Sequence, residues 1–216
     1  MRIIDLGKED YLKVWDFQKE LYHKALDLKK ENLSVENTLI FCEHPPVYTL
    51  GKSGNESNLL FSKELLGAEV YRIERGGDIT FHGEGQLVGY PIFDLDSLNI
   101  GIKDFVFAIE QVIINTVAHF GIEAARDPKN AGVWLAVGEK NQRKIAALGF
   151  KISKKISMHG FALNVNTDLT WFSKVVPCGL VGLGVTSLEK ELKNKQDFQQ
   201  VQAILLAEFK KVFSIE

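Results

Sequence analysis

The stretch from Arg75 to Gln86, RGGDITFHGEGQ, constrains the fold more than any other part of the sequence. It contains four glycines and lies between two apolar segments that are typical of strands. Ordered glycine is entropically costly, so this density predicts positive φ angles or a group that approaches the bare backbone closely. Because Arg75 and His82 fall in the same stretch, we interpret it as a ligand-binding edge.

The composition is that of one globular domain spanning residues 1–216. Apolar residues make up 45% of the chain, which is enough for a core of ordinary size, and the net charge of −2 indicates neither a nucleic-acid nor a membrane-surface partner. No apolar run approaches the ~20 residues that span a bilayer, and the N-terminus lacks the apolar region of a secretory signal. Two cysteines without a CxxC motif predict a reduced, cytoplasmic protein with neither a disulfide framework nor a structural zinc site.

Hydrophobic periodicity predicts helices and strands in alternating groups. Helices are expected over residues 10–30, 102–120 and 198–212, and strands over 38–43, 47–50, 70–74, 87–95, 132–137, 144–152 and 157–165. Pro45 and Pro46 enforce a bend between the first two strands, and Thr186 with Glu189 has the spacing of a capping box. This order favours an α+β (two-layer α/β) fold, in which helices pack on a mixed, largely antiparallel sheet.

Cys178 lies in VVPCGLVGLG, a proline- and glycine-rich loop sequence. A thiol on such a loop can be presented beside bare amide N–H groups, which suits a nucleophile whose acyl intermediate needs oxyanion donors. The alternative is a small buried hydrophobic residue, as most free cysteines are. Cys42 lies in a predicted strand and is expected to pack there.

A nucleophilic thiol needs a neighbouring base. His82 and His159 each precede a glycine and are candidates, whereas His23 and His119 lie on predicted helices and His44 precedes two prolines in a turn. Lys144 is the other candidate, because it enters the apolar run IAALG, where partial desolvation would lower its pKa. The alternative, which is the commoner case for a single lysine, is that Lys144 lies in water at the end of a strand.

Five blocks, in order, resemble the signature segments of the lipoyl(octanoyl) transferase family. They are EHPPVYTLGKS, RGGDITFHGEGQLVGYPI, DPKNAGVW, RKIAALG with HGFALNVNTDL, and VVPCGL. They cover roughly residues 43–188, which is most of the chain. The resemblance implies a fold shared with biotin and lipoate protein ligases, and an enzyme that moves an octanoyl or lipoyl group from acyl carrier protein to a lysine of a lipoyl domain.

The resemblance also implies roles for individual residues. Cys178 takes the position of the cysteine that forms the acyl thioester, and Lys144 that of the acid/base lysine. The acyl-substrate contacts fall on three segments: Arg75, Gly76, Gly77, Asp78, Ile79, Thr80, Phe81 and His82; Ala147, Leu148 and Gly149; and Gly160, Phe161 and Ala162. Leu148, Phe161, Leu163 and Val176 are candidate walls for the acyl chain.

The implied partners are octanoyl-acyl carrier protein as donor and, as acceptors, lipoyl domains of 2-oxoacid dehydrogenases or the H protein of glycine cleavage. No cofactor or metal is needed, and nothing in the sequence requires more than a monomer. Residues 139–155 carry six lysines and arginines against one acid, and with Arg72 and Arg75 they could form a docking rim for acidic carriers. The alternative is that these charges are simply solvated.

Two positions depart from the family pattern. The loop that usually reads HGPGQ has Glu84 in place of the proline, which predicts a more flexible loop with a negative charge near the site. Ala147 stands where a serine is frequent in the family.

Two other functions remain open. One is an ATP-dependent ligase of the same fold, whose activity would depend on ATP. The other is a catalytically silent module that binds an acyl chain or a carrier protein, which would have no use for Cys178 and Lys144. No Walker-type phosphate loop occurs in the chain.

Overall fold

The computed structural model describes the chain except residues 62, 176–182 and 216, and the side chains of residues 63 and 64 are likewise left out. In chain order its elements are β1 (Arg2–Lys8), α1 (Tyr11–Lys30), β2 (Thr38–Glu43), β3 (Val47–Leu50), a 3-10 turn (Glu56–Asn58), α2 (Lys63–Leu66), β4 (Glu69–Arg72), β5 (Ile79–His82), β6 (Gln86–Ile92), α3 (Ile102–Ala118), β7 (Ala125–Arg126), β8 (Val133–Leu135), β9 (Arg143–Ser153), β10 (Ile156–Asn164), a second 3-10 turn (Leu169–Lys174), β11 (Gly184–Val185), α4 (Leu188–Leu192) and α5 (Phe198–Phe213).

Two sheets organise the described part of the chain. The larger has the order β1-β2-β6-β10-β9-β8-β7, with β11 paired to β9, and the smaller has the order β4-β3-β5. The pairs β1–β2, β9–β11 and β3–β4 are parallel and the others are antiparallel. The predicted mixed, largely antiparallel sheet with helices is therefore confirmed.

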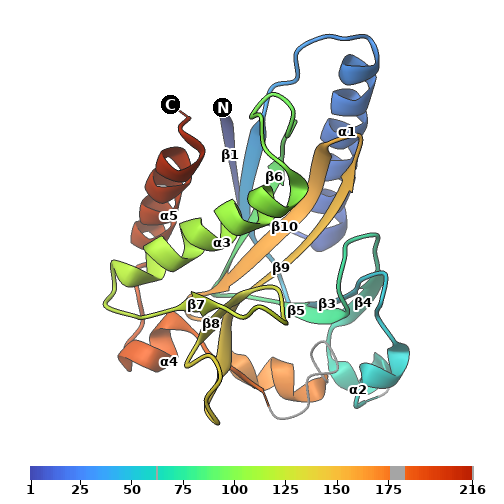
Figure 1. The fold of residues 1–216 in the computed structure, drawn as a ribbon. Coiled ribbons are helices and arrows are strands. Elements are labelled where there is room, and N and C mark those ends of the chain that lie inside the picture. Colours follow the sequence, from blue (N-terminus) through green and yellow to red (C-terminus); the bar gives the residue numbers. More distant parts are fainter. Residues whose placement is uncertain (62, 176–182, 216) are drawn as a thin grey trace.

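Helices cover both faces of the large sheet (Figure 1). Along β2, Leu39 and Phe41 contribute to the core under α3 and α5, whereas Ile40 and Cys42 contribute to the core under α1. Successive strand residues point to opposite faces, so a strand that is buried along its whole length supplies two cores at once. The prediction that Cys42 packs within a strand is confirmed, because it is buried there.

Pro45 and Pro46 stand where the chain leaves the large sheet and enters the small one. β2 ends at Glu43 and β3 begins at Val47, so the predicted bend is the junction between the sheets. β3 is then the central strand of the small sheet, which lies beside the lower end of β9 and β10 in Figure 1. This junction brings the glycine-rich segment 75–86 against the large sheet.

Helices α1, α4 and α5 begin at capping residues that the sequence contains, but one cap lies one residue later than predicted. Asp10 and Asp197 cap α1 and α5 by accepting hydrogen bonds from backbone N–H groups in the first turn. The predicted capping box was displaced by one residue, because Ser187 rather than Thr186 caps α4, and the Thr186 hydroxyl bonds Glu191 instead. None of the helices in the described residues is long and apolar enough to cross a membrane.

Candidate active site

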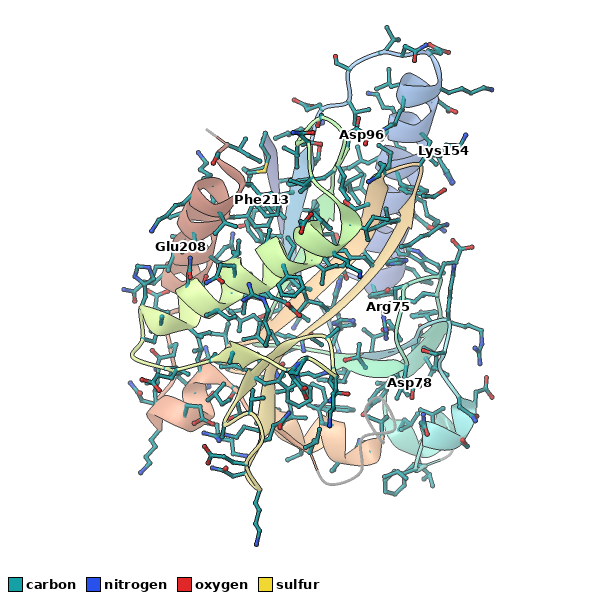
Figure 2. The ribbon with its side chains drawn as sticks, in the orientation of Figure 1. Arg75, Asp78, Asp96, Lys154, Glu208 and Phe213 are labelled. Carbon is teal, nitrogen blue, oxygen red and sulfur yellow. The ribbon has the colours of Figure 1, made fainter. Side chains whose placement is uncertain are left out.

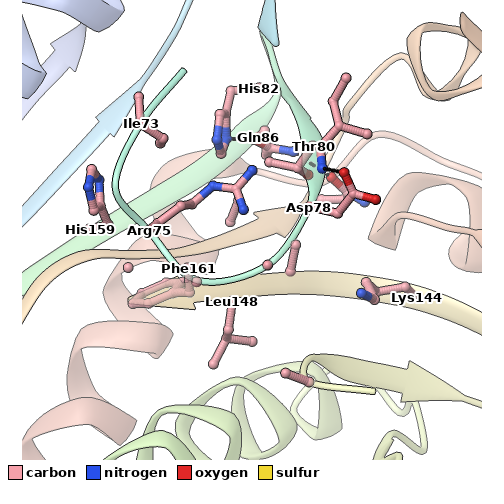
Figure 3. Close-up of a pocket in the computed structure, with 18 of the residues that line it drawn as sticks. Ile73, Arg75, Asp78, Thr80, His82, Gln86, Lys144, Leu148, His159 and Phe161 are labelled. Atoms are coloured by element: carbon pink, nitrogen blue, oxygen red, sulfur yellow. Dashed lines mark hydrogen bonds between the residues drawn. The ribbon is translucent and has the colours of Figure 1, made fainter. Parts of the chain in front are cut away.

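A cavity of about 270 Å³ lies where the small sheet, β9 and β10 meet (Figure 3). Most of its accessible wall is apolar, with polar groups at both ends. Its lining consists of Tyr11, Ser53, Ile73, Arg75, Gly77, Asp78, Ile79, Thr80, His82, Gln86, Tyr90, Lys129, Asn130, Ala131, Lys144, Ala147, Leu148, Gly149, His159, Gly160, Phe161, Ala162, Asn164, Phe172 and Val185.

The structure brings nearly all the described candidate site residues to this cavity. Lys144 and the three predicted acyl-contact segments line it, apart from Gly76 and Phe81. The N–H of Gly76 donates to the carbonyl of Phe150, which ties the glycine-rich segment to β9. The ring of Phe81 stacks on Trp171 within the core of the small sheet, with 5.3 Å between ring centroids.

Three further expected residues are not among the described lining, and only one of them, Leu163, is described by the structure. Leu163 is fully buried in the core beneath α3 and α5. Cys178 and Val176 lie outside the described residues. The role of Cys178 as nucleophile therefore stays a prediction.

Gly149 explains how the glycine-rich segment can lie on β9. A Cβ atom at this position would come within 2.9 Å of the carbonyl oxygen of Gly76 and 3.0 Å of the Arg75 side chain. Real Cβ atoms are not found this close to backbone atoms, so a larger residue would push the segment away from the strand. The cavity wall thus depends on a residue without a side chain.

Arg75 is buried, with only 8% of its surface exposed. Its Nη2 donates to the Thr49 carbonyl oxygen at 2.7 Å and to Thr49 Oγ1 at 3.0 Å, Nε donates to the same hydroxyl at 3.3 Å, and Nη1 donates to the Gly76 carbonyl at 3.0 Å. These bonds hold the guanidinium within the cavity wall. The expectation that Arg75 belongs to a docking rim was wrong, because a docking rim must be accessible to its partner.

His82 belongs to a hydrogen-bond chain whose direction is fixed. The Gln86 amide nitrogen donates to Asn164 Oδ1 at 2.9 Å and to the Phe81 carbonyl at 3.2 Å, so its oxygen must accept from His82 Nδ1, 2.8 Å away. His82 Nε2 is then the acceptor and faces the Thr49 hydroxyl at 3.5 Å. Asn164 completes the chain by donating to the Thr186 carbonyl at 2.9 Å.

Burial keeps the imidazole of His82 neutral. It lowers the pKa of His82 to about 3, with smaller contributions from neighbouring His44 and from Arg75. Figure 3 shows the His82 ring beside Arg75 and Gln86, and it also stacks on Tyr11 with 6.0 Å between ring centroids. The neutral ring is held between Gln86 and Thr49, so it can orient these two neighbours.

His44, expected as a turn residue, does precede the bend at Pro45 and Pro46, and its side chain belongs to the core. It is fully buried; its Nδ1 lies 2.8 Å from the Glu9 carbonyl, and its Nε2 lies 2.9 Å from the Tyr90 hydroxyl. The bend that follows it turns the ring inward beneath Tyr11. His119, expected to be structural or solvent-facing, lies 3.1 Å from the Glu208 carboxylate, and its side chain is half exposed.

His159 is the most unusual residue of β10. Its φ of +63° is left-handed, a conformation that costs a residue with a side chain roughly 1–2 kcal/mol, and its N–H donates to Gln18 Oε1 at 3.2 Å. The side chain is 2% exposed, and neither ring nitrogen has a hydrogen-bond partner among the described residues. Burial, followed by the charge of Arg75, lowers its pKa to about 3.

Lys144 lies at the start of β9, as predicted, and is half-buried. Its Nζ is 4.5 Å from the centroid of the Trp134 ring, which is a cation–π contact. β11 pairs in parallel here, with Val185 opposite Lys144, and the Thr186 N–H donates to the Lys144 carbonyl. The segment that follows Cys178 in the sequence therefore returns to Lys144.

Glu84 does not line the cavity. Its carboxylate pairs with Lys8, and both side chains are about half exposed or more. The loop is ordered without a proline, because Gly85 adopts a φ of +75°, its N–H donates to Glu43 at 2.8 Å and its carbonyl accepts from Asn166 at 2.8 Å. The carboxylate is thus outside the cavity wall and paired with Lys8, and the greater flexibility of the loop stays a prediction.

The basic segment 139–155 does not form one surface. β9 spans Arg143 to Ser153, about 30 Å at 3.3 Å per residue, so Lys140 and Arg143 are separated from Lys154 and Lys155 by the length of the strand. Figure 2 shows Lys154 at the hairpin tip, away from Arg75 and Asp78. Arg143 pairs with Glu191 and Lys151 with Glu74, so part of this charge is also neutralised.

Several residues of the site carried no recognisable signal in the sequence. Thr49, Tyr11 and Asn164 reach it from β3, α1 and the end of β10, and each looked like an ordinary helix or strand residue. Gln86 was noted only as the end of the glycine-rich stretch. Their roles depend on the junction between the sheets, which local sequence does not encode.

The family model of the lipoyl protein ligase A/B catalytic domain matches residues 10–210. The chain belongs to this family. A curated relative named octanoyltransferase, from Christiangramia forsetii, is 44% identical over all of this chain and 97% of its own length. Another of the same name, from Flavobacterium johnsoniae, is 45% identical with the same coverage.

Solved structures agree with the fold. A bipartite lipoate protein ligase from Thermoplasma acidophilum, described with its E2 lipoyl domain, has a TM-score of 0.74 at 17% identity over all of this chain and 84% of its own. A lipoate-protein ligase A bound with ATP has a TM-score of 0.73 at 16% identity, covering all of this chain and 86% of its own. The biotin protein ligase of Aquifex aeolicus with biotin and ATP is more distant, with a TM-score of 0.57 at 13% identity over 99% of this chain and 70% of its own.

Proposed function

We propose that this octanoyl-transferring enzyme carries the acyl group from acyl carrier protein to a lysine of a lipoyl domain through a thioester on Cys178. Octanoyl transfer is the activity of its full-length relatives. The observation that supports the detailed mechanism is the cavity, whose wall joins Lys144 to the three segments expected to contact the acyl group.

The chemistry needs no energy source. A carrier thioester and a cysteine thioester are close in free energy, so the first transfer is nearly balanced, and attack of a lysine amine on the second thioester runs downhill to an amide. Each step requires one proton to move near the sulfur. In the first step Lys144 would accept the Cys178 thiol proton and return it to the departing carrier thiol. In the second step it would take a proton from the attacking lysine amine as the C–N bond forms and pass it to the Cys178 thiolate, which leaves as the C–S bond breaks.

The cavity suits a medium-length acyl chain. Ile73, Leu148 and Phe161 supply apolar wall between the Lys144 end and the His159 end (Figure 3). At about 0.8 kcal/mol per buried carbon, the seven alkyl carbons of an octanoyl group would contribute about 6 kcal/mol of binding. The hydrogen bonds from His82 to Gln86 and from Arg75 to Thr49 hold this part of the wall in place.

The acceptors we propose are lipoyl domains, and the enzyme acts on them and on its donor in the cytoplasm as a monomer. Lys129 is exposed at the cavity and Lys140 lies on the turn before β9, so both could meet an acidic carrier near the reacting end. Lys154 and Lys155 lie too far along β9 to take part.

A transfer assay without ATP tests this function against that of an ATP-dependent ligase. Octanoyl-carrier protein and a lipoyl domain are mixed with the enzyme, and the domain is digested and its modified lysine identified by mass. We expect modification without ATP and no gain when ATP is added. Modification that requires free octanoate and ATP would contradict the proposal. The Cys178→Ala variant is the matched control and should give no product.

A further inference from the structure

The face of the Trp134 ring lies against the charged end of Lys144. Trp134 on β8 is directly opposite Lys144 on β9, so the two side chains lie on the same face of the sheet. The ammonium nitrogen is 4.5 Å from the centroid of the ring. Figure 3 shows Lys144 at the end of the cavity away from His159. Among the described residues, Lys144 is the one cation that both lies over an aromatic ring and lines the cavity.

The stem of the lysine packs against the backbone of Gly132, the residue before β8. A Cβ atom here would lie 3.2 Å from Lys144 Cε and 2.7 Å from the Ala146 carbonyl oxygen, and the φ of +129° is one that residues with side chains rarely adopt. The N–H of Gly132 donates to Glu110 Oε1 at 3.1 Å. Glu110 is 5% exposed and also pairs with Arg126 Nε at 3.1 Å, so this backbone is anchored to α3.

The Trp134 ring is fixed by contacts of its own. It is 1% exposed, and its Nε1 donates to the Asn130 carbonyl at 3.0 Å. The side-chain amide of Asn130 in turn donates to Asp127 at 2.6 Å. A buried ring whose N–H is bonded in this way presents one face to Lys144.

The strand is irregular at the same point. Trp134 is opposite Lys144 and Val133 is opposite Ala146, so Ile145 has no counterpart on β8. Such β-bulges twist a strand locally and re-aim a side chain, and they are common beside active sites. The bulge, the ring and the glycine all act on the one side chain of Lys144.

We propose that Trp134 is a positioning residue for octanoyl transfer, because its ring holds the ammonium of Lys144 in one place for proton transfer. This inference rests on the proposed function, which makes Lys144 the group that moves the protons. The four-carbon stem of a lysine is flexible, and misplacement of a catalytic group by about 1 Å can cost about 100-fold in rate. Trp134 is not part of the described cavity lining and acts only through Lys144.

Single-turnover acylation separates positioning from donor binding. Octanoyl-carrier protein is mixed in excess with the native protein, Trp134→Leu or Trp134→Phe, without ATP, and the rate is measured against donor concentration. Leucine has no ring face, whereas phenylalanine keeps a weaker one. Trp15→Leu is the matched control, because Lys19 Nζ also lies 4.5 Å from that ring and neither residue lines the cavity.

For Trp134→Leu we expect the rate constant at saturating donor to fall at least about tenfold, while the donor concentration for half of that rate changes less than about twofold. Trp134→Phe should stay within about threefold of the native rate constant, and Trp15→Leu should match it. The amplitude of the reaction counts folded sites, so partial unfolding of a variant lowers the amplitude and leaves the rate constant unchanged.

A spectrum of the native protein tests the contact without any change at Trp134. Protons that lie against the face of an aromatic ring resonate upfield. The methylene signal next to the Lys144 ammonium is identified, with carbon-labelled lysine, by its absence from Lys144→Ala. We expect this signal upfield of the main group of lysine signals.

Three results would overturn the role of Trp134. They are a Lys144 signal within the main group, a native rate constant in Trp134→Leu, and a Trp134→Phe variant as slow as Trp134→Leu. Native transfer with any of these results refutes the positioning role alone. A native protein that transfers no octanoyl group refutes the proposed function and the positioning role together.

Discussion

The hydroxyl of Thr49 holds Arg75 in the cavity wall by accepting hydrogen bonds from its guanidinium, and Thr49→Val tests how much this contributes. Valine keeps the shape and the strand preference of threonine but removes the acceptor for Arg75 Nε and for one of the two bonds from Nη2. It also removes the hydroxyl that faces His82 Nε2. The Thr49 carbonyl still accepts from Nη2 at 2.7 Å, so Arg75 keeps part of its anchor.

The expected loss follows from these bonds. Hydrogen bonds to charged groups contribute about 1.5–3 kcal/mol each, and the lost hydroxyl accepts from two nitrogens of a buried guanidinium. The bond from Nη2 to the Thr49 carbonyl remains and offsets part of this loss. We expect a loss of about 3 kcal/mol of unfolding free energy. In a chain of this size that corresponds to a fall in Tm of about 6–12 °C. Transfer activity should fall as well, because Arg75 and the segment behind it lose their position.

Thr116→Val is the matched control. Thr116 is equally buried, and its hydroxyl bonds the Val112 carbonyl at 2.7 Å within α3, far from the cavity. That bond is between neutral groups, so we expect a loss of about 1 kcal/mol and no change in activity. Thermal unfolding and initial transfer rates are measured for both variants and for Thr49→Ser, which should restore most of the loss. Equal losses for the two valine variants would refute the reasoning.

Three further predictions concern other parts of the molecule. Burial lowers the pKa of His159 to about 3, so below pH 6.5 the unfolded chain binds a proton there and the folded chain does not, and the free energy of unfolding falls from pH 6.5 toward pH 3. In urea titrations, His159→Asn should reduce this pH dependence by up to about 1.4 kcal/mol per pH unit. An unchanged pH dependence would contradict the burial argument. Glu84→Gln should change unfolding free energy by less than about 0.5 kcal/mol, since its ion pair with Lys8 is exposed, and a loss above 1 kcal/mol would show that the loop depends on it. Lys144→Ala should slow acylation at least about 100-fold while circular dichroism shows a retained fold, and an unchanged rate would remove Lys144 from the proton relay.

The sequence was most informative where structure is local. Helix α3 was expected over residues 102–120 and spans Ile102–Ala118, because its apolar stripe and following glycine are properties of the helix alone. The hairpin of β9 and β10 was predicted within a residue or two, since its strands and turn are adjacent in the chain. The two strands that flank Pro45 and Pro46 matched in full.

Prediction failed where distant contacts decide the structure. β1 was missed because it lies at an edge and alternates weakly, and β5 was treated as loop because glycines flank it. On α1 the apolar Leu12 is 38% exposed, whereas the polar Gln18 is fully buried and its oxygen accepts a hydrogen bond from the N–H of His159. Such choices follow from the packing partner and not from the periodicity of the helix.

The site was predicted through the resemblance more than through physical patterns. Glycine density identified the segment that forms the cavity wall, and the apolar run after Lys144 correctly placed that lysine at the start of a strand. Tyr11, Thr49 and Asn164 could not be found in this way. Thr49 bonds Arg75, Asn164 bonds Gln86 and Tyr11 stacks on His82 only after the two sheets have joined.

The central claim is that Cys178 carries the acyl group, and intact mass spectrometry tests it most directly. The protein is mixed with octanoyl-carrier protein without ATP, quenched in acid within seconds and weighed, and a lipoyl domain is then added to a second sample. The account predicts one octanoyl adduct that maps to Cys178, is absent from Cys178→Ala and disappears when the acceptor is added. An adduct that persists in Cys178→Ala, or acceptor modification by that variant at the native rate, would contradict it.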